Sequence, residues 1–330
     1  MKAIYLLPEH NHSLIYGPDE QRDIASRVEL IAPRQDAQSV LLQPPGTFDE
    51  VEVIFSGWGM AKMDADFFAR FPKLKVLFYG AGAVSGFVTE EVWQRGIVIS
   101  NANVANGIAV AEYTVAQIYL CLKQVWQAAL RIKREGHYHK PPHVAGAYGS
   151  TVGIISLGAI GRMVAERLRG TDIHLIAYDP FMTPEQAAAL NVELTTLEVL
   201  FQRADVITCH TPWLPETEGM LNGRLFRLMK PGANFINTAR GAVVNEPELI
   251  EVLGERPDLF AVLDVTWPEP PVLGSPLYTL PNVILTPHVA GTMNDECRRM
   301  GRMMVEELER WLAGQPLQHQ VSRQYARARG

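Results

Sequence analysis

The stretch TVGIISLGAIGRMVAERL, residues 151–168, has the pattern of a buried strand that runs into a helix through a glycine-rich turn. The turn is Ser156-x-Gly158-x-x-Gly161, so a serine stands where dinucleotide-binding turns have their first glycine. Gly158 would let the backbone approach a pyrophosphate, and Gly161 would let the helix pack closely on the strand. A positive φ at Ser156 would cost only about 1–2 kcal/mol. The stretch therefore predicts a nucleotide-binding turn that tolerates its serine.

The strand predicted after this turn ends in a carboxylate. The run IHLIAYDP ends in Asp179 and Pro180, and Asp179 lies 21 residues after Gly158. A carboxylate at this spacing can accept hydrogen bonds from the adenosine ribose hydroxyls and would repel a 2′-phosphate. No lysine or arginine stands in the DPFMTPEQ that begins at Asp179. We therefore expect NAD rather than NADP; the alternative role of Asp179 is a turn or helix cap before Pro180.

Short apolar runs alternate with helical patterns in two sets, which is typical of parallel α/β domains. The first set predicts strands at 2–7, 28–32, 51–57, 74–80 and 97–100, with helices at 64–71 and 89–95. The second set predicts six strands from residue 151 onward, with helices at 159–169, 184–190, 196–203, 223–229 and 246–253. A last helix, at about 293–313, would return to the first domain. The expected fold is α/β with two doubly wound parallel sheets: a Rossmann domain at 105–290 inserted in a flavodoxin-like domain formed by 1–104 and 291–330.

Between the two sets, residues 107–136 fit one long amphipathic helix. We expect its apolar stripe to belong to the core; the stripe consists of Ile118, Tyr119, Leu122 and Trp126. Because the helix carries more apolar surface than one neighbour would cover, it is a candidate dimer face. We expect a homodimer.

Composition restricts the class of protein. The 330 residues carry a formal net charge of −6, and no lysine or arginine cluster is longer than the RQYARARG tail, which argues against a nucleic-acid partner. No apolar run approaches the roughly 20 residues of a membrane helix, and the N-terminus reads as a strand rather than a signal peptide. The three cysteines, Cys121, Cys209 and Cys297, are far apart and predict neither a disulfide framework nor a zinc site. We expect a cytoplasmic protein.

Four stretches after the nucleotide turn carry further polar residues: HTPWLPETEGMLN (210–222), NTARGAVVNEPEL (237–249), LDVTWPEPP (263–271) and LTPHVAGT (285–292). Together they strongly resemble the D-isomer-specific 2-hydroxyacid dehydrogenase family. The resemblance covers most of the chain and is strongest over 151–292. It implies that Arg240 is the catalytic arginine, Glu269 the catalytic glutamate and His288 the acid–base histidine.

The chemistry of these residue types agrees with the resemblance. Reduction of a 2-keto acid needs a fixed cation for the substrate carboxylate and the developing alkoxide, and the planar guanidinium of Arg240 can supply it. The reaction also needs a proton donor that titrates near neutrality, and the imidazole of His288 is the natural choice. A carboxylate beside that ring, here Glu269, would orient it and stabilise its cation. Each residue alone could equally be an ion pair, a loop residue or a strand end; three at predicted strand ends favour a site.

The cofactor-binding residues predicted from the turn and from the resemblance form one larger set. Asp264 is implied to contact the nicotinamide carboxamide. The set comprises Ser156, Gly158, Ala159, Ile160, Gly161, Asp179, Pro180, His210, Thr211, Pro212, Thr217, Thr238, Ala239, Asp264, His288 and Gly291.

The substrate-binding residues are expected in the first domain. FYGAGAVSG (78–86) stands where the family has a glycine-rich loop whose backbone N–H groups bind the substrate carboxylate, which implies Ala81 and Gly82. The family's usual aspartate just after this loop is replaced by Val84 and Ser85. Trp58 follows an earlier strand and either borders the same pocket or packs in the core.

Three histidines lie in GHYHKPPHVAGAYG (136–149), namely His137, His139 and His143. The prolines and glycines predict a loop, and without a fourth ligand or closed spacing we expect no metal site.

The expected function is NAD-dependent interconversion of a D-2-hydroxy acid and a 2-keto acid. A phosphoglycerate enzyme is disfavoured because neither GWGMA (57–61) nor FYGAGAVSG (78–86) contains a lysine or arginine to hold a phosphate. A formate dehydrogenase is disfavoured because a glutamate, Glu269, stands where those enzymes have glutamine. The alternatives are a non-catalytic NAD(H)-binding sensor, like the corepressor members of the family, and a methyltransferase, in which the trio would have no role.

Overall fold

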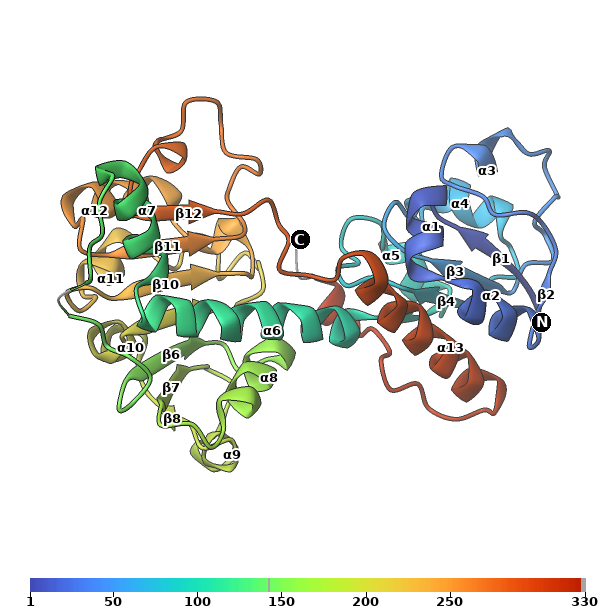
Figure 1. Ribbon diagram of the computed structural model, residues 1–330. Helices are drawn as coiled ribbons and strands as arrows, with labels where there is room; N and C mark the ends of the chain where they lie inside the picture. Colours follow the sequence, from blue (N-terminus) through green and yellow to red (C-terminus); the bar gives the residue numbers. More distant parts are fainter. Residues whose placement is uncertain (142, 328–330) are drawn as a thin grey trace. The chain divides into compact units, whose positions relative to one another are not determined.

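The computed structural model describes residues 1–141 and 143–327 and divides into two compact units (Figure 1). One unit, called here the flanking unit, comprises Met1–Asn106 and Thr292–Gly330. The other, called the inserted unit, comprises Gly107–Gly291. The sequence placed these boundaries after residues 104 and 290.

The flanking unit is built on a five-stranded parallel sheet in the order β2-β1-β3-β4-β5. This is the flavodoxin-like order, so the expected fold class is confirmed. The strands are β1 (Lys2–Leu6), β2 (Glu29–Leu30), β3 (Val53–Ser56), β4 (Val76–Tyr79) and β5 (Val98–Asn101). The helices are α1 (Glu9–Ile15), α2 (Pro18–Ala25), α3 (Ser39–Leu42), α4 (Ala65–Arg70), α5 (Glu90–Gln94) and α13 (Arg298–Leu312). The sequence did not predict α1, α2 or α3.

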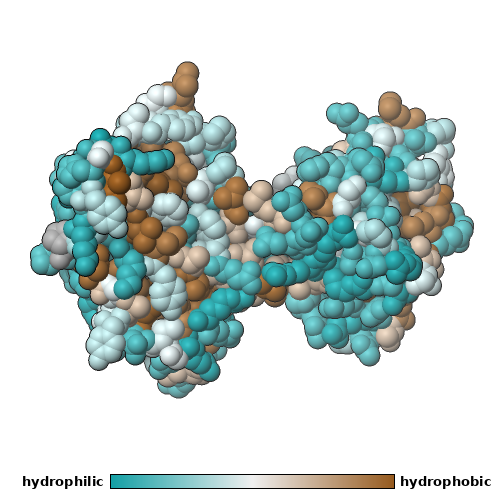
Figure 2. Space-filling model, in the orientation of Figure 1, coloured by the Kyte–Doolittle hydropathy of each residue, from teal (hydrophilic) through white to brown (hydrophobic). Residues whose placement is uncertain are grey.

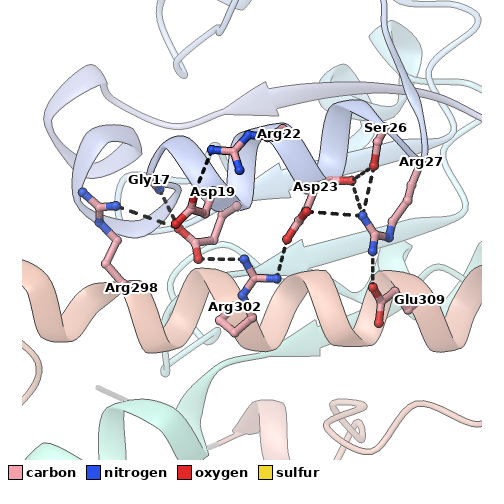
Figure 3. A network of polar contacts seen from close by, with 10 residues as sticks. Gly17, Asp19, Arg22, Asp23, Ser26, Arg27, Arg298, Arg302 and Glu309 are labelled. Carbon is pink, nitrogen blue, oxygen red and sulfur yellow. Dashed lines mark hydrogen bonds and ion pairs between the residues drawn. The ribbon is translucent and has the colours of Figure 1, made fainter.

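A network of ion pairs connects the last helix, α13, to α2 (Figure 3). The guanidinium of Arg302 lies 2.6 Å from Asp23 and 3.1 Å from Glu20, whose carboxylate is also 4.0 Å from Arg298. Glu20 is only 6% exposed, so these cations compensate a buried charge. A Cβ at Gly301 would lie 2.0 Å from the carbonyl oxygen of Ile15, so glycine permits the close approach of α13. The two ends of the chain therefore build one domain.

The inserted unit contains a seven-stranded parallel sheet in the order β12-β11-β10-β9-β6-β7-β8. Counted from β6 as strand one, this is the Rossmann order 3-2-1-4-5-6 with one strand added beyond it. The strands are β6 (Thr151–Ile155), β7 (His174–Tyr178), β8 (Glu193–Leu194), β9 (Val206–Cys209), β10 (Asn234–Asn237), β11 (Phe260–Leu263) and β12 (Val283–Leu285). The helices after β6 are α8 (Ala159–Leu168), α9 (Pro184–Ala189), α10 (Leu197–Arg203), α11 (Gly223–Arg227) and α12 (Glu246–Glu255). The sequence missed only β8 among the strands, because it is two residues long.

The prediction of one long helix over 107–136 is wrong. The structure has two helices, α6 (Asn103–Leu122) and α7 (Val125–Glu135). Between them Gln124 adopts the left-handed conformation, with a φ of 52°, and its N–H bonds to the carbonyl oxygen of Cys121. A left-handed residue ends the helical hydrogen-bond ladder, and glutamine gives no sequence signal of such a break.

The predicted apolar stripe is core only in part. Ile118 and Leu122 are buried, Trp126 is partly buried against the same cluster, and Tyr119 is 37% exposed. Among the described residues, every helix is too short or too polar to cross a bilayer.

Candidate active site

The predicted nucleotide turn joins β6 to α8 and has glycine where close contact requires it. A Cβ at Gly161 would lie 2.1 Å from the carbonyl oxygen of Ser156, so α8 packs here only because residue 161 is glycine. At Gly158, the N-cap of α8, an added Cβ would meet no atom within 4 Å. Open space before the N–H groups of a helix N-terminus fits a pyrophosphate.

Ser156 takes the left-handed conformation that a first glycine would adopt, with a φ of 73°. Its hydroxyl lies 2.9 Å from that of Thr211. Ser156 follows β6 and Thr211 follows β9, the adjacent strands between which the strand order reverses. Ligands of open α/β sheets bind at such a switch point. The turn therefore accommodates the serine, whose hydrogen bond to Thr211 links the loops that follow β6 and β9.

The carboxylate of Asp179 is fixed by two backbone hydrogen bonds, one of which comes from the predicted nucleotide turn. One carboxylate oxygen accepts the N–H of Leu157 at 2.7 Å, and the other accepts the N–H of Phe181 at 2.8 Å. The sequence analysis missed a cation in this region: Arg162 on α8 reaches over to Met182, with Nη2 3.2 Å from the sulfur. Only the fold brings these residues together, because Arg162 stands 20 residues before Met182.

His210, which follows β9, has a polar atom without a protein partner. Its Nε2 lies 3.1 Å from the hydroxyl of Thr208, whereas its Nδ1 is buried and makes no hydrogen bond to any described residue. Burial lowers the pKa of His210 to about 3, so the ring is neutral near pH 7. An orphaned ring nitrogen beside Thr211 fits a site that a cofactor completes.

Two threonines of the predicted cofactor set are engaged within the protein. Thr217 donates its hydroxyl to the carbonyl oxygen of Pro212 at 2.7 Å and closes its own turn. Thr238, which is 6% exposed, shares a hydrogen bond of 3.2 Å with Thr114 on α6.

Asp264, which follows β11, holds the segment that carries His288. Its carboxylate accepts the hydroxyl of Thr286 at 2.6 Å and the N–H groups of Val289 and Ala290, each at 2.9 Å. Its carbonyl oxygen accepts the N–H of His288 at 3.0 Å. The carboxylate thus accepts three hydrogen bonds from described residues, and the resemblance implies a further contact with the nicotinamide carboxamide. These four hydrogen bonds, called here the clamp of Asp264, were not predicted from the sequence.

His288 and Glu269 are brought together across 19 residues of sequence. His288 Nδ1 lies 2.7 Å from Glu269 Oε1. Their side chains are 47% and 39% exposed, so both are open to a substrate. His288 has a φ of 54°, a strained conformation that the clamp of Asp264 maintains.

The loop that carries Glu269 has its own anchor, which the sequence analysis also missed. Glu246, at the start of α12, accepts the N–H of Trp267 at 2.9 Å. Desolvation by burial raises the pKa of Glu246 above its ordinary value. The Trp267 ring packs edge-on against Trp213, with ring centroids 4.5 Å apart.

Arg240 follows β10 and lies against the same loop. A Cβ at Gly241 would lie 2.0 Å from the carbonyl group of Thr266, so these two segments touch. Asn237 fixes the backbone before the arginine, because its side chain accepts the N–H of Ala239 and donates to the carbonyl oxygen of Arg240. The arginine side chain is partly exposed. Within the inserted unit, the predicted catalytic residues therefore follow neighbouring strands β10, β11 and β12.

The expected substrate residues belong to the flanking unit. Trp58 follows β3, and Ala81 and Gly82 follow the neighbouring strand β4. Trp58 is partly exposed and packs against the apolar clusters on both faces of the sheet. Ala81 is fully buried, and its N–H pairs with the carbonyl oxygen of Tyr79 at 2.8 Å. A substrate carboxylate would have to replace that bond.

Comparison with known proteins agrees with this arrangement. Residues 115–290 match the family model described as D-isomer specific 2-hydroxyacid dehydrogenase, NAD binding domain. The D-3-phosphoglycerate dehydrogenase of Methanocaldococcus jannaschii is 34% identical over 274 residues, 83% of this chain and 52% of that protein. The enzyme of the same name from Archaeoglobus fulgidus is 32% identical over 262 residues, 79% of this chain and 50% of that protein. The chain thus spans about half the length of the curated relatives it matches.

A solved structure covers nearly the whole chain. The TT0316 protein from Thermus thermophilus has a TM-score of 0.76 and 27% identity, covering 98% of this chain and 100% of its own. The family model covers the inserted unit, and the structural match covers both units. The chain belongs to the D-isomer specific 2-hydroxyacid dehydrogenase family, and its inserted unit is the NAD-binding domain of that family.

Proposed function

We propose that this protein is an NAD-dependent oxidoreductase that interconverts a D-2-hydroxy acid and a 2-keto acid. The observation that carries the proposal is the contact of 2.7 Å between His288 and Glu269. This pair lies on loops that follow β11 and β12, and Arg240 lies on the loop that follows the neighbouring strand β10. A cation, a proton carrier and an orienting carboxylate are the groups that the reduction of a 2-keto acid requires.

Each residue has one role in the proposed reduction. The guanidinium of Arg240 holds the substrate carboxylate and the polarised carbonyl oxygen. NADH supplies the hydride that reduces C2 of the substrate. His288 gives a proton to the carbonyl oxygen, so that keto acid, NADH and one proton become hydroxy acid and NAD⁺. Glu269 orients the ring by binding Nδ1, which leaves Nε2 for the proton transfer.

The proposed preference for NADH over NADPH depends on Asp179. Its carboxylate is fixed at the end of β7 by the N–H groups of Leu157 and Phe181, and a 2′-phosphate beside it would be repelled. Arg162 lies near Met182 and would attract such a phosphate. We propose that the repulsion of a 2′-phosphate by Asp179 outweighs its attraction by Arg162, because two backbone hydrogen bonds hold the Asp179 carboxylate in position.

The substrate class follows from the flanking unit. Relatives that are about one-third identical are named D-3-phosphoglycerate dehydrogenases. The two loops proposed to face the substrate, 57–61 and 78–86, carry no lysine or arginine, although the exposed Lys62 follows the first. We therefore propose a small 2-keto acid without a phosphate group.

The test is the rate of NADH oxidation with glyoxylate, hydroxypyruvate, phosphohydroxypyruvate, pyruvate, phenylpyruvate and branched 2-keto acids. We expect turnover of an unphosphorylated substrate, and at least a roughly 100-fold lower kcat/KM for Arg240→Ala. Tryptophan fluorescence titrated with NADH shows whether the variant still binds the cofactor. Normal NADH binding without turnover of any keto acid would favour the sensor alternative, and a preference for phosphohydroxypyruvate would overturn the substrate class.

We also propose a homodimer that uses the surface of α7 and the segment after it. Figure 2 shows residues of high hydropathy on the visible face of the inserted unit. Among the described residues of this part of the chain, five large apolar side chains are exposed: Val125, Leu130, Tyr138, Val144 and Tyr148. Light scattering should therefore give about twice the chain mass of 36.7 kDa, and a mass equal to the chain mass at micromolar concentration would refute the dimer.

A further inference from the structure

A cluster of possible metal ligands lies outside the residues proposed to bind cofactor and substrate. Glu135 ends α7, and Gly136, with a φ of 72°, turns the chain back toward it. His137 and His139 follow, and one ligand atom of each of the three side chains lies within 4.8 Å of the other two. The two imidazole rings lie 4.0 Å apart, centroid to centroid. The sequence analysis considered His137, His139 and His143 without Glu135 and expected no metal site.

The hydrogen bonds of the cluster suit metal binding. His137 Nδ1 lies 3.0 Å from the carbonyl oxygen of Glu135. A carbonyl oxygen only accepts, so Nδ1 carries the proton in the neutral ring and Nε2 keeps its lone pair. Histidines that bind metals are commonly oriented by this bond from the second ring nitrogen to a backbone carbonyl.

His139 adds a second nitrogen and Glu135 an oxygen. His139 Nε2 is buried and lies 2.5 Å from Glu135 Oε2. Two imidazole nitrogens and one carboxylate oxygen are a ligand set that zinc accepts, with water in the fourth position. We propose that Glu135, His137 and His139 bind one divalent transition-metal ion of the zinc class.

Two neighbouring cations set the expected strength of the site. Arg131 Nε lies 3.1–3.2 Å from the two oxygens of Glu135, and Arg134 Nη2 lies 3.0 Å from Oε1. A metal ion would therefore share the carboxylate of Glu135 with these two guanidinium groups. The arginines also repel a dication, so the affinity should increase when Arg134 is neutralised.

The experiment uses the full-length protein after treatment with a chelator. Zinc is titrated in competition with a chromophoric chelator, and we expect one ion per chain. His137→Ala and His139→Ala should each weaken binding by about 10- to 100-fold or more, and Arg134→Gln should strengthen it. His143→Ala, His174→Ala and His288→Ala are the matched controls, because they remove other histidines of the inserted unit, and each should bind as the wild type does.

Thermal unfolding gives an independent readout. Saturating zinc should raise the Tm of the wild type, because an ion that binds only the folded state stabilises it. The Tm of the His137→Ala/His139→Ala double variant should equal that of the wild type without zinc and should not respond to zinc. Absence of saturable binding, undiminished binding by the double variant, or loss of binding in His288→Ala would overturn the proposal.

Discussion

The Nδ1 atom of His288 lies 2.7 Å from a carboxylate oxygen of Glu269. The two residues come from separate loops, and each loop has its own anchor. Asp264 binds the backbone on the carboxyl side of the histidine, and Glu246 binds the backbone N–H of Trp267 two residues before the glutamate. Hydrogen bonds within the protein therefore fix the backbone on which both residues of the pair stand.

Replacement of Glu269 tests the pair directly. Glu269→Gln removes the negative charge that orients the ring and stabilises its cation, so we expect kcat to fall by about 100- to 1,000-fold. The KM for NADH should change little, because Glu269 is not among the residues proposed to bind the cofactor. Glu251→Gln, an exposed carboxylate paired with Arg227, is the control and should leave kcat unchanged. A kcat for Glu269→Gln within threefold of the wild type would contradict the proposed role.

Ser156 offers a comparison between two small residues. Ser156→Ala keeps the left-handed strain and loses the hydrogen bond to Thr211, so it should lower the free energy of unfolding by about 1 kcal/mol. Ser156→Gly should be about 1 kcal/mol more stable than Ser156→Ala, because the relieved strain of about 1–2 kcal/mol exceeds the entropic cost of glycine. Urea unfolding measures both values. Equal stability of the two variants would show that the left-handed conformation is not strained.

The neutral ring of His210 predicts a dependence of stability on pH. Its pKa is lowered from 6.5 to about 3 by burial, so between these values the unfolded chain binds a proton that the folded chain does not. The free energy of unfolding therefore falls as the pH drops below 6.5, and His210 should account for about 2 kcal/mol of the loss between pH 7 and pH 5.

Denaturant unfolding at the two pH values tests this contribution. His210→Gln should lose about 2 kcal/mol less than the wild type on acidification. His174→Gln, which replaces an exposed histidine on β7, should behave as the wild type does. An unchanged pH dependence in His210→Gln would mean that the ring is protonated in the folded state.

The ion-pair network of Figure 3 predicts different effects for two arginines. Arg302→Met leaves the buried Glu20 with Arg298 as its remaining cation, and we expect a loss of about 1–3 kcal/mol in the free energy of unfolding. Arg22→Met breaks a pair whose side chains are 71% and 73% exposed and should cost at most about 0.5 kcal/mol. Equal effects in thermal or urea unfolding would show that Glu20 does not depend on α13.

The sequence predicted the parallel sheets because their strands are continuous apolar runs, which is the local signature of strands buried on both faces. It missed α1, α2 and α3, and it missed the break at Gln124, where neither glycine nor proline marks the left-handed residue. The requirement for glycine at position 161 was visible in the pattern because the contact it permits, with Ser156, is only five residues away.

The hydrogen bonds that support the site had no such signal. Asp264 and Glu246 accept hydrogen bonds from backbone N–H groups of distant segments. Because a backbone N–H does not depend on the residue type, the sequence of those segments does not indicate the bond. Arg162 meets Met182, and Glu135 meets His139, only once the turns between them are formed. The family motifs pointed to residues expected to touch ligands, whereas the residues that position them became visible only in the fold.

The most direct test of the proposed reaction is the transfer of deuterium from NADH dideuterated at C4 of the nicotinamide to the product. With a 2-keto acid that the protein turns over, we expect one deuterium at C2 of a hydroxy acid of D configuration, detected by mass spectrometry and chiral chromatography. Arg240→Ala and His288→Ala should both abolish the transfer, and Arg240→Ala should still bind NADH. A product without deuterium at C2, or one of L configuration, would contradict the account.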